Sequence, residues 1–72
     1  MSRTVTKMEG RVKWFNNVAG MGYIAVEDHP DVFFHRSEIL APNVALGADE
    51  LVEFDLIEDE QGVHAANVTP ME

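Results

Sequence analysis

The sequence contains no cysteine, little positive charge and no long apolar run. Without cysteine, the chain can form no disulfide framework. Its longest apolar stretches are a few residues, too short to span a membrane, and the first residues do not resemble a signal peptide. We therefore expect a cytoplasmic protein that has no membrane partner.

Positive charge is scarce, but negative charge is abundant. The sequence has five Lys and Arg residues and 13 Asp and Glu residues, which gives a formal net charge of -8. Most nucleic-acid binders are basic, because Lys and Arg neutralise phosphates. The two halves of the chain differ, however. Residues 1–36 hold all five cations and four carboxylates, a net charge of +1, whereas residues 37–72 hold nine carboxylates and no Lys or Arg. The cations that a phosphate would need therefore all lie in the first half.

Gly, Pro, Asn and Asp divide the 72 residues into short segments, none with the sustained 3.6-residue period of a helix. A chain of this length has room for one domain with one core. The expected strands are residues 7–16, 21–27, 32–36, 51–58 and 63–69, with a turn at 28–31, a short helical turn at 37–40 and a long connection at 41–50. Five short strands predict an all-β fold, a small closed barrel without exposed sheet edges.

Alternation along the strands assigns the side chains to two faces of the barrel wall. The side chains expected to fill the core are Val12, Ile24, Val26, Val32, Phe34, Val52, Phe54, Leu56 and Val68. On the fourth strand, Ile57 falls on the outer face. Tyr23, Phe33 and His35 then stand outside as well. An outward row of flat side chains near cations is typical of single-strand binders, which stack bases at roughly 1–3 kcal/mol each.

Four segments resemble the cold-shock protein family: Lys13-Trp14-Phe15-Asn16, Gly20-Met21-Gly22-Tyr23-Ile24, Asp31-Val32-Phe33-Phe34-His35 and Ala65-Ala66-Asn67-Val68-Thr69. The likeness extends over residues 7–69, with the motifs in the family's order. It implies a single cold-shock-like domain over residues 1–72, folded as a five-stranded antiparallel oligonucleotide-binding (OB) barrel. It also implies an RNA-chaperone-like protein that binds single-stranded RNA or DNA, with no catalysis, cofactor or metal.

The resemblance further implies a nucleic-acid-binding site, built from stacking positions, one strand cation and one polar contact. By position in the motifs these are Lys13, Trp14, Phe15, Met21, Tyr23, Phe33, His35, Arg36 and His64. Three positions depart from the family's pattern, which usually has Lys at Ala19, Phe at Met21 and an aromatic residue at Arg36. Residues 40–46 also lack an aromatic that many members carry. Because these changes lie on the expected ligand face, we expect an intact barrel with weaker, salt-sensitive binding.

Each of these residues also has a structural interpretation. Trp14 could be a partly buried barrel residue, and Phe15 could pack on the core at a strand bulge instead of facing a base. The other structural alternatives are Tyr23 and Phe33 as ordinary surface cover, Met21 as an apolar filler, Arg36 as the partner of a carboxylate such as Glu38, and His64 without a ligand contact.

Two functions are compatible with the sequence. The first is a single-stranded nucleic-acid binder, which the aromatic residues favour. The alternative is an acidic protein-interaction module derived from a cold-shock barrel, which would bind a basic protein and which the net charge favours. An enzyme is disfavoured, because no catalytic set is evident and the three histidines lack metal-ligand spacing. We expect a monomer, and the sequence leaves a dimer open.

Overall fold

The structure, a computed structural model, describes residues 3–40 and 46–71. Its elements are β1 (Thr4–Asn16), β2 (Met21–Val26), β3 (His29–His35), the 3-10 helix η1 (Arg36–Glu38), β4 (Leu51–Asp59) and β5 (Gly62–Pro70). The predicted all-β fold is confirmed. Of the long connection predicted at 41–50, residues 41–45 lie outside the described part of the chain.

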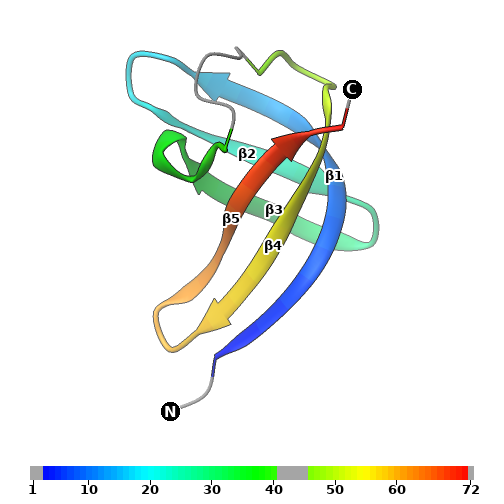
Figure 1. The fold of residues 1–72 in the computed structure, drawn as a ribbon, viewed down its shortest axis with the longest axis vertical. Helices are drawn as coiled ribbons and strands as arrows, with labels where there is room; N and C mark the ends of the chain where they lie inside the picture. Colours follow the sequence, from blue (N-terminus) through cyan, green and yellow to red (C-terminus); the bar gives the residue numbers. More distant parts are fainter. Residues whose placement is uncertain (1–2, 41–45, 72) are drawn as a thin grey trace.

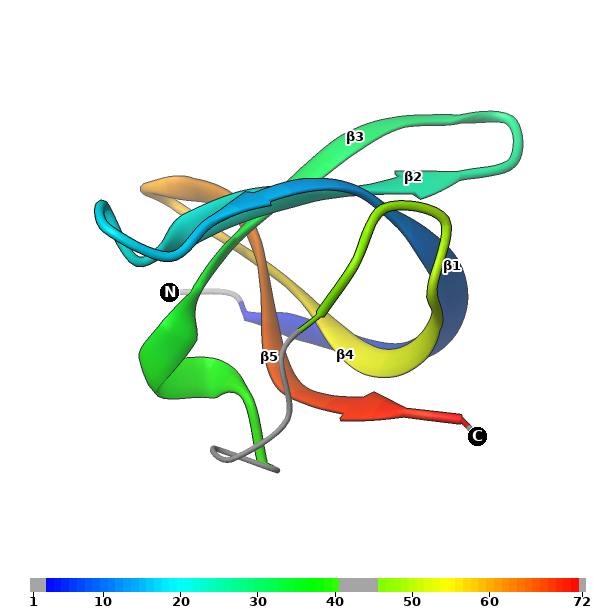
Figure 2. The same ribbon diagram turned by 90° about the horizontal axis from the view of Figure 1, so that it is seen from above.

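The five strands close into a barrel in the order β1-β2-β3-β5-β4 (Figures 1 and 2). The long, curved β1 pairs with β4 along its first half and with β2 along its second half. All pairs are antiparallel except β3 with β5, which is parallel and joins Phe33 to His64. The OB barrel is confirmed, but a wholly antiparallel one is ruled out. Each antiparallel step reverses direction, so a closed ring of five strands must contain a parallel pair.

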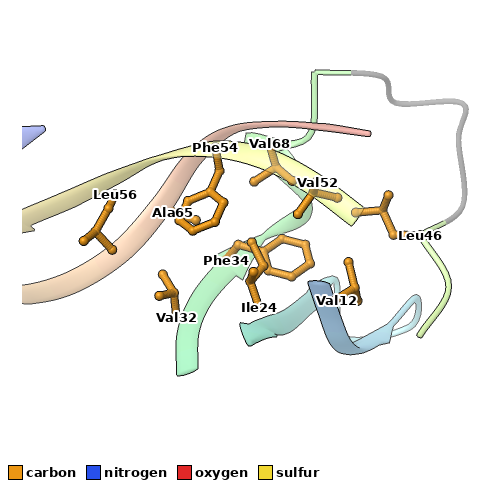
Figure 3. Close-up of a cluster of buried hydrophobic side chains, with 10 residues drawn as sticks. All are labelled: Val12, Ile24, Val32, Phe34, Leu46, Val52, Phe54, Leu56, Ala65 and Val68. Carbon is orange, nitrogen blue, oxygen red and sulfur yellow. The ribbon is translucent and has the colours of Figure 1, made fainter. Parts of the chain in front are cut away.

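The inward side chains of all five strands meet in one apolar core (Figure 3). Its members are Val12, Ile24, Val32, Phe34, Leu46, Val52, Phe54, Leu56, Ala65 and Val68. Eight of the nine predicted core residues are buried, and the ninth, Val26, is half-buried against the core. Each large side chain buried in this way contributes roughly 1.5–3 kcal/mol. The period-2 pattern therefore identified most of the barrel interior.

Ile57 is the main exception on the outer face, because it is only 5% exposed. Its position in the alternation is as predicted, opposite the inward set of β4. Its direct cross-strand neighbours are Val5 on β1 and His64 on β5. Large cross-strand neighbours can cover a residue that alternation places on the outer face.

The turn between β2 and β3 is also tighter than predicted. It occupies residues 27–28, with Asp28 in the left-handed region at a φ of 60°, and His29 already belongs to β3. Pro30 lies within the strand, where the β2–β3 register shifts between Ile24 and Val26. At such an irregularity a proline need not donate a ladder hydrogen bond. The predicted helical turn at 37–40 begins one residue earlier, as η1.

Candidate nucleic-acid interface

A bulge in β1 places two consecutive side chains on the outside of the barrel. The β1–β2 register runs from Val12 opposite Ile24 to Trp14 opposite Tyr23, so two steps along β1 match one step along β2. Lys13 is the extra residue, and both Lys13 and Trp14 are exposed. A β-bulge commonly re-aims side chains in this way. The bulge therefore brings a cation and an indole ring to one surface.

Four flat side chains form a continuous line across the barrel wall, which we call the aromatic row: Trp14, Tyr23, Phe33 and His64. Each is the direct cross-strand neighbour of the next, on β1, β2, β3 and β5. The ring centroids of Trp14 and Tyr23 are 5.4 Å apart, and those of Tyr23 and Phe33 are 5.8 Å apart. Such separations are favourable for aromatic pairs. Trp14 remains 43% exposed, and the other three are half-buried. The rings therefore support one another and still present surface to solvent.

A second, shorter line runs beside the aromatic row. Asn16, Met21 and His35 are cross-strand neighbours on β1, β2 and β3. By alternation they share the outer face with the aromatic row. His35 is exposed, and Met21 is 36% exposed. The Asn16 side chain lies in the β1–β2 turn, where its Oδ1 accepts hydrogen bonds from the backbone N–H groups of Val18 and Ala19.

Arg36 lies at the end of this second line, over the turn that contains Gly20. Its Nε is 3.1 Å from the point that a Cβ would occupy at Gly20, whose φ is +73°. Its backbone N–H donates to the Gly20 carbonyl at 2.9 Å, and its Nη1 donates to the Asn17 carbonyl at 3.5 Å. Glu38, the suggested alternative partner, instead accepts a hydrogen bond from the backbone of Asn67. The Arg36 side chain is thus held beside these two lines of side chains, and the residue is exposed.

Phe15 points away from these lines and towards the core. Its ring stacks on Phe34 with centroids 5.5 Å apart and planes 12° from parallel. It is half-buried against the core cluster and lies opposite Gly22 on β2. A Cβ at Gly22 would sit 3.1 Å from the Phe34 ring, so the glycine leaves room for this packing. Of the two interpretations of Phe15, the geometry corresponds to packing at the bulge.

Lys13, the strand cation, already has a partner on the same surface. Its Nζ lies 2.7 Å from Asp31 Oδ2, with the two side chains 57% and 36% exposed. Asp31 is not among the site residues predicted from the sequence. The signal was present, because Asp31, Phe33 and His35 alternate along one strand and must share a face. A phosphate that approaches Lys13 therefore meets a carboxylate as well.

Two further cations, Lys7 and Arg11, have partners that do not belong to the aromatic row. Lys7 pairs with Asp55 on β4, at 3.7 Å, and Arg11 Nη1 donates to the Asp49 carbonyl at 3.0 Å.

Elsewhere an open depression is lined by Glu9, Gly10, Arg11, Ala25, Val26, Glu27, Asp49 and Leu51. Within residues 3–40 and 46–71, no three His, Asp or Glu side chains are placed to hold a metal ion. In the same ranges, no helix is both long and apolar enough to cross a bilayer.

A closed five-stranded barrel with a row of aromatic side chains and neighbouring cations defines a class of protein, the OB-fold binders of nucleic acid. Within that class, the chain belongs to the cold-shock domain family. The family model described as the "'Cold-shock' DNA-binding domain" matches residues 8–71. The predicted family, the OB barrel and the nucleic-acid-binding function are thereby confirmed. Members of this family are binding domains and not enzymes, and membership does not favour the acidic protein-interaction module.

Named relatives agree with this assignment. The cold shock-like protein CspC of Bacillus cereus is 45% identical over 65 residues, which cover 89% of this chain and 100% of the relative. The cold shock protein CspA of Staphylococcus aureus is 42% identical over 64 residues, 88% of this chain and 97% of the relative. The human Y-box-binding protein 3 is 46% identical over 70 residues, 89% of this chain but only 19% of that protein. The domain therefore resembles both stand-alone proteins and part of a larger one.

Proposed function

We propose that the protein binds unpaired RNA or DNA by stacking bases on the aromatic row, and that it melts weak secondary structure by mass action without ATP. The observation that carries this proposal is the direct cross-strand alignment of Trp14, Tyr23 and Phe33, with centroid spacings of 5.4 and 5.8 Å. Rings in such a line offer successive π-faces to successive bases, which is how sequence-tolerant binders hold a single strand.

Stacking supplies most of the affinity in this proposal. Three members of the aromatic row, Trp14, Tyr23 and Phe33, together with His35 in the line beside it, give a gross stacking energy on the order of 4–12 kcal/mol, at roughly 1–3 kcal/mol per base. Ordering the strand and the side chains consumes part of this energy. Micromolar binding, which corresponds to about -8 kcal/mol, is within reach.

Cations make a smaller contribution than in a basic binder. Lys13 is shared with Asp31, and Arg36 stands where the family usually has an aromatic side chain. A guanidinium can stack on a base and can also pair with phosphate. With Arg11, Lys13 and Arg36 as the nearest cations, we expect about two or three neutralised phosphates. The slope of log K against log salt should then be about -1.5 to -2, at roughly -0.7 per phosphate.

We further propose that this is a single domain over residues 1–72 that acts in the cytoplasm as a monomer, without catalysis or cofactor. These statements rest on the family assignment and on relatives that match along nearly their whole length. A basic protein partner becomes the working hypothesis only if the nucleic-acid test below fails.

The test is a titration of Trp14 fluorescence, which is unambiguous because the chain has one tryptophan. Short pyrimidine-rich and mixed single-stranded oligonucleotides are added at low and moderate salt. We expect saturable quenching, greatly weakened in Phe33→Ala. Val5→Ala is the matched control, because Val5 is a 54% exposed apolar residue on the far half of β1. No quenching up to high micromolar oligonucleotide, in a protein that circular dichroism shows to be folded, would overturn the proposal.

A further inference from the structure

His35 makes hydrogen bonds that define which of its ring nitrogens carries the proton. Its Nδ1 lies 3.1 Å from the backbone nitrogen of Ser37 and 3.0 Å from Ser37 Oγ. A backbone N–H can only donate, so His35 Nδ1 must accept. In the neutral ring the proton then resides on Nε2, which becomes a hydrogen-bond donor.

His29 shows the opposite arrangement on the same strand. Its Nδ1 lies 2.7 Å from the carbonyl oxygen of Pro30. A carbonyl oxygen can only accept, so the proton of neutral His29 resides on Nδ1. The two histidines at the ends of β3 are therefore expected in different tautomers, which provides an internal reference.

The geometry around His35 explains why its ring is held. His35 is the last residue of β3 and has an extended backbone, with φ of -108° and ψ of 151°. The chain then turns into η1, where the backbone N–H of Ser37 needs an acceptor, because the first N–H groups of a helical turn have no carbonyl partner. The imidazole supplies that acceptor. One hydrogen bond therefore satisfies the backbone and orients the ring.

The other ring nitrogen is left for a ligand. Within the described residues, the side-chain hydrogen bonds of His35 all use Nδ1. The side chain is exposed and lies beside Met21, on the same face as Phe33 of the aromatic row. We propose that the hydrogen bond from the backbone N–H of Ser37 keeps the proton of neutral His35 on Nε2. The ligand group opposite Nε2 must then be a hydrogen-bond acceptor. This inference rests on the proposed function and deepens it.

The acceptor is either a carbonyl oxygen of a base or an oxygen of a phosphate. An exocyclic amino group is rejected there, because it would place a donor against a donor. Uracil and cytosine differ at this point of chemistry, since position 4 carries a carbonyl oxygen in uracil and an amino group in cytosine. His35 is thus a specificity-determining residue, and Ser37 is the positioning residue behind it.

The first arm of the test measures the tautomers in the protein without ligand. Long-range ¹H–¹⁵N correlation spectra of the imidazoles at pH 8 should show His35 protonated on Nε2 and His29 protonated on Nδ1. Ser37→Ala keeps the backbone N–H, so the His35 pattern should persist in that variant. A His35 ring protonated on Nδ1, or one that exchanges between both tautomers, would overturn the proposal.

The second arm identifies the ligand group that accepts the hydrogen bond from His35 Nε2. It compares oligonucleotide affinities, measured by Trp14 fluorescence. Oligouridine, oligocytidine and a methylphosphonate form of oligouridine are titrated into the wild-type protein and into His35→Phe, which keeps a flat ring but has no N–H. If the acceptor is a base carbonyl, the wild type should bind oligocytidine about fivefold more weakly than oligouridine, which is the effect of one hydrogen bond. The variant should then bind oligouridine and oligocytidine equally well. If the acceptor is a phosphate oxygen, the variant should lose about fivefold on both natural oligonucleotides and less on the methylphosphonate, in which a methyl group replaces one of the two non-bridging oxygens and removes the negative charge.

If His35→Phe loses the same affinity for all three ligands, or for none of them, the proposed recognition of an acceptor by His35 is wrong. If no oligonucleotide binds the wild type, the proposed function is wrong and the proposal for His35 is wrong with it. The tautomers are measured on the protein alone, so that result distinguishes a wrong function from a wrong account of the ring.

Discussion

Replacing Asp31 by Asn tests whether the ion pair with Lys13 limits nucleic-acid binding. Asp31 Oδ2 lies 2.7 Å from Lys13 Nζ, on the face that carries the aromatic row. A phosphate must compete with this carboxylate for the cation and must also approach its negative charge. The substitution removes both obstacles, so we expect tighter binding.

The magnitude follows from Coulomb's law and from the exposure of the pair. A carboxylate about 7 Å from a phosphate repels it by roughly 0.6 kcal/mol in a dielectric of about 80. An exposed ion pair is worth about 0.2–1 kcal/mol, and these side chains are 57% and 36% exposed. Together the two terms are about 0.8–1.6 kcal/mol at low salt, or a gain in affinity of roughly four- to fifteenfold.

The assay is the Trp14 titration at several salt concentrations. If Asp31 keeps Lys13 from neutralising a phosphate, the wild-type slope of log K against log salt corresponds to about two phosphates, and Asp31→Asn should steepen it by about 0.7. Glu9→Gln is the control, because it makes the same change in net charge at an exposed position on the first half of β1. Weaker or unchanged binding by Asp31→Asn, with Glu9→Gln behaving as wild type, would refute the reasoning. Weaker binding would also indicate that Asp31 itself contacts the ligand.

Three predictions concern stability and are measured by urea unfolding. Gly22→Ala should be strongly destabilising, by several kcal/mol, because the new Cβ would meet the Trp14 carbonyl oxygen. Its control, Gly47→Ala, has nothing within 4 Å and should change stability by less than about 0.5 kcal/mol. Similar losses of stability in the two variants would contradict the close approach at Gly22. Ile24→Val, at 0% exposure, should cost about 0.5–1.5 kcal/mol with an unchanged m value, and a neutral result would argue against a packed core. Asn67 has a φ of 54°, so Asn67→Ala should be about 1 kcal/mol less stable than Asn67→Gly; equal stabilities would show that the left-handed backbone carries no strain.

Local pattern in the sequence accounts for much of the candidate site. Alternation predicted that Tyr23, Phe33 and His35 lie outside the barrel and that Ile24 and Phe34 lie inside. In the structure Ile24 and Phe34 are buried, whereas the other three are half-buried or exposed. Period-2 alternation is a property of a single strand, so it can be read without knowing which strands are neighbours. The same pattern places Asp31 on the face that carries the aromatic row.

The bulge in β1 lies at the limit of such local reasoning. Strict alternation over Val12, Lys13, Trp14 and Phe15 would put Trp14 inside, yet it is exposed and Phe15 packs on the core. The register shift that resolves this depends on β2, where the consecutive residues Tyr23 and Ile24 lie opposite Trp14 and Val12 and leave Lys13 without a partner. A bulge belongs to a pair of strands and is not encoded by the period of either alone.

The sequence by itself determined the all-β class, most of the core and which side chains share a strand face, because these follow from local alternation and from turn residues. Only the tertiary structure decided that β3 and β5 close the barrel in parallel, which places His64 beside Phe33, and that Asp31 reaches Lys13. Those contacts join residues distant in the chain. Their geometry depends on strand order, register and ring closure, and no short segment carries that information.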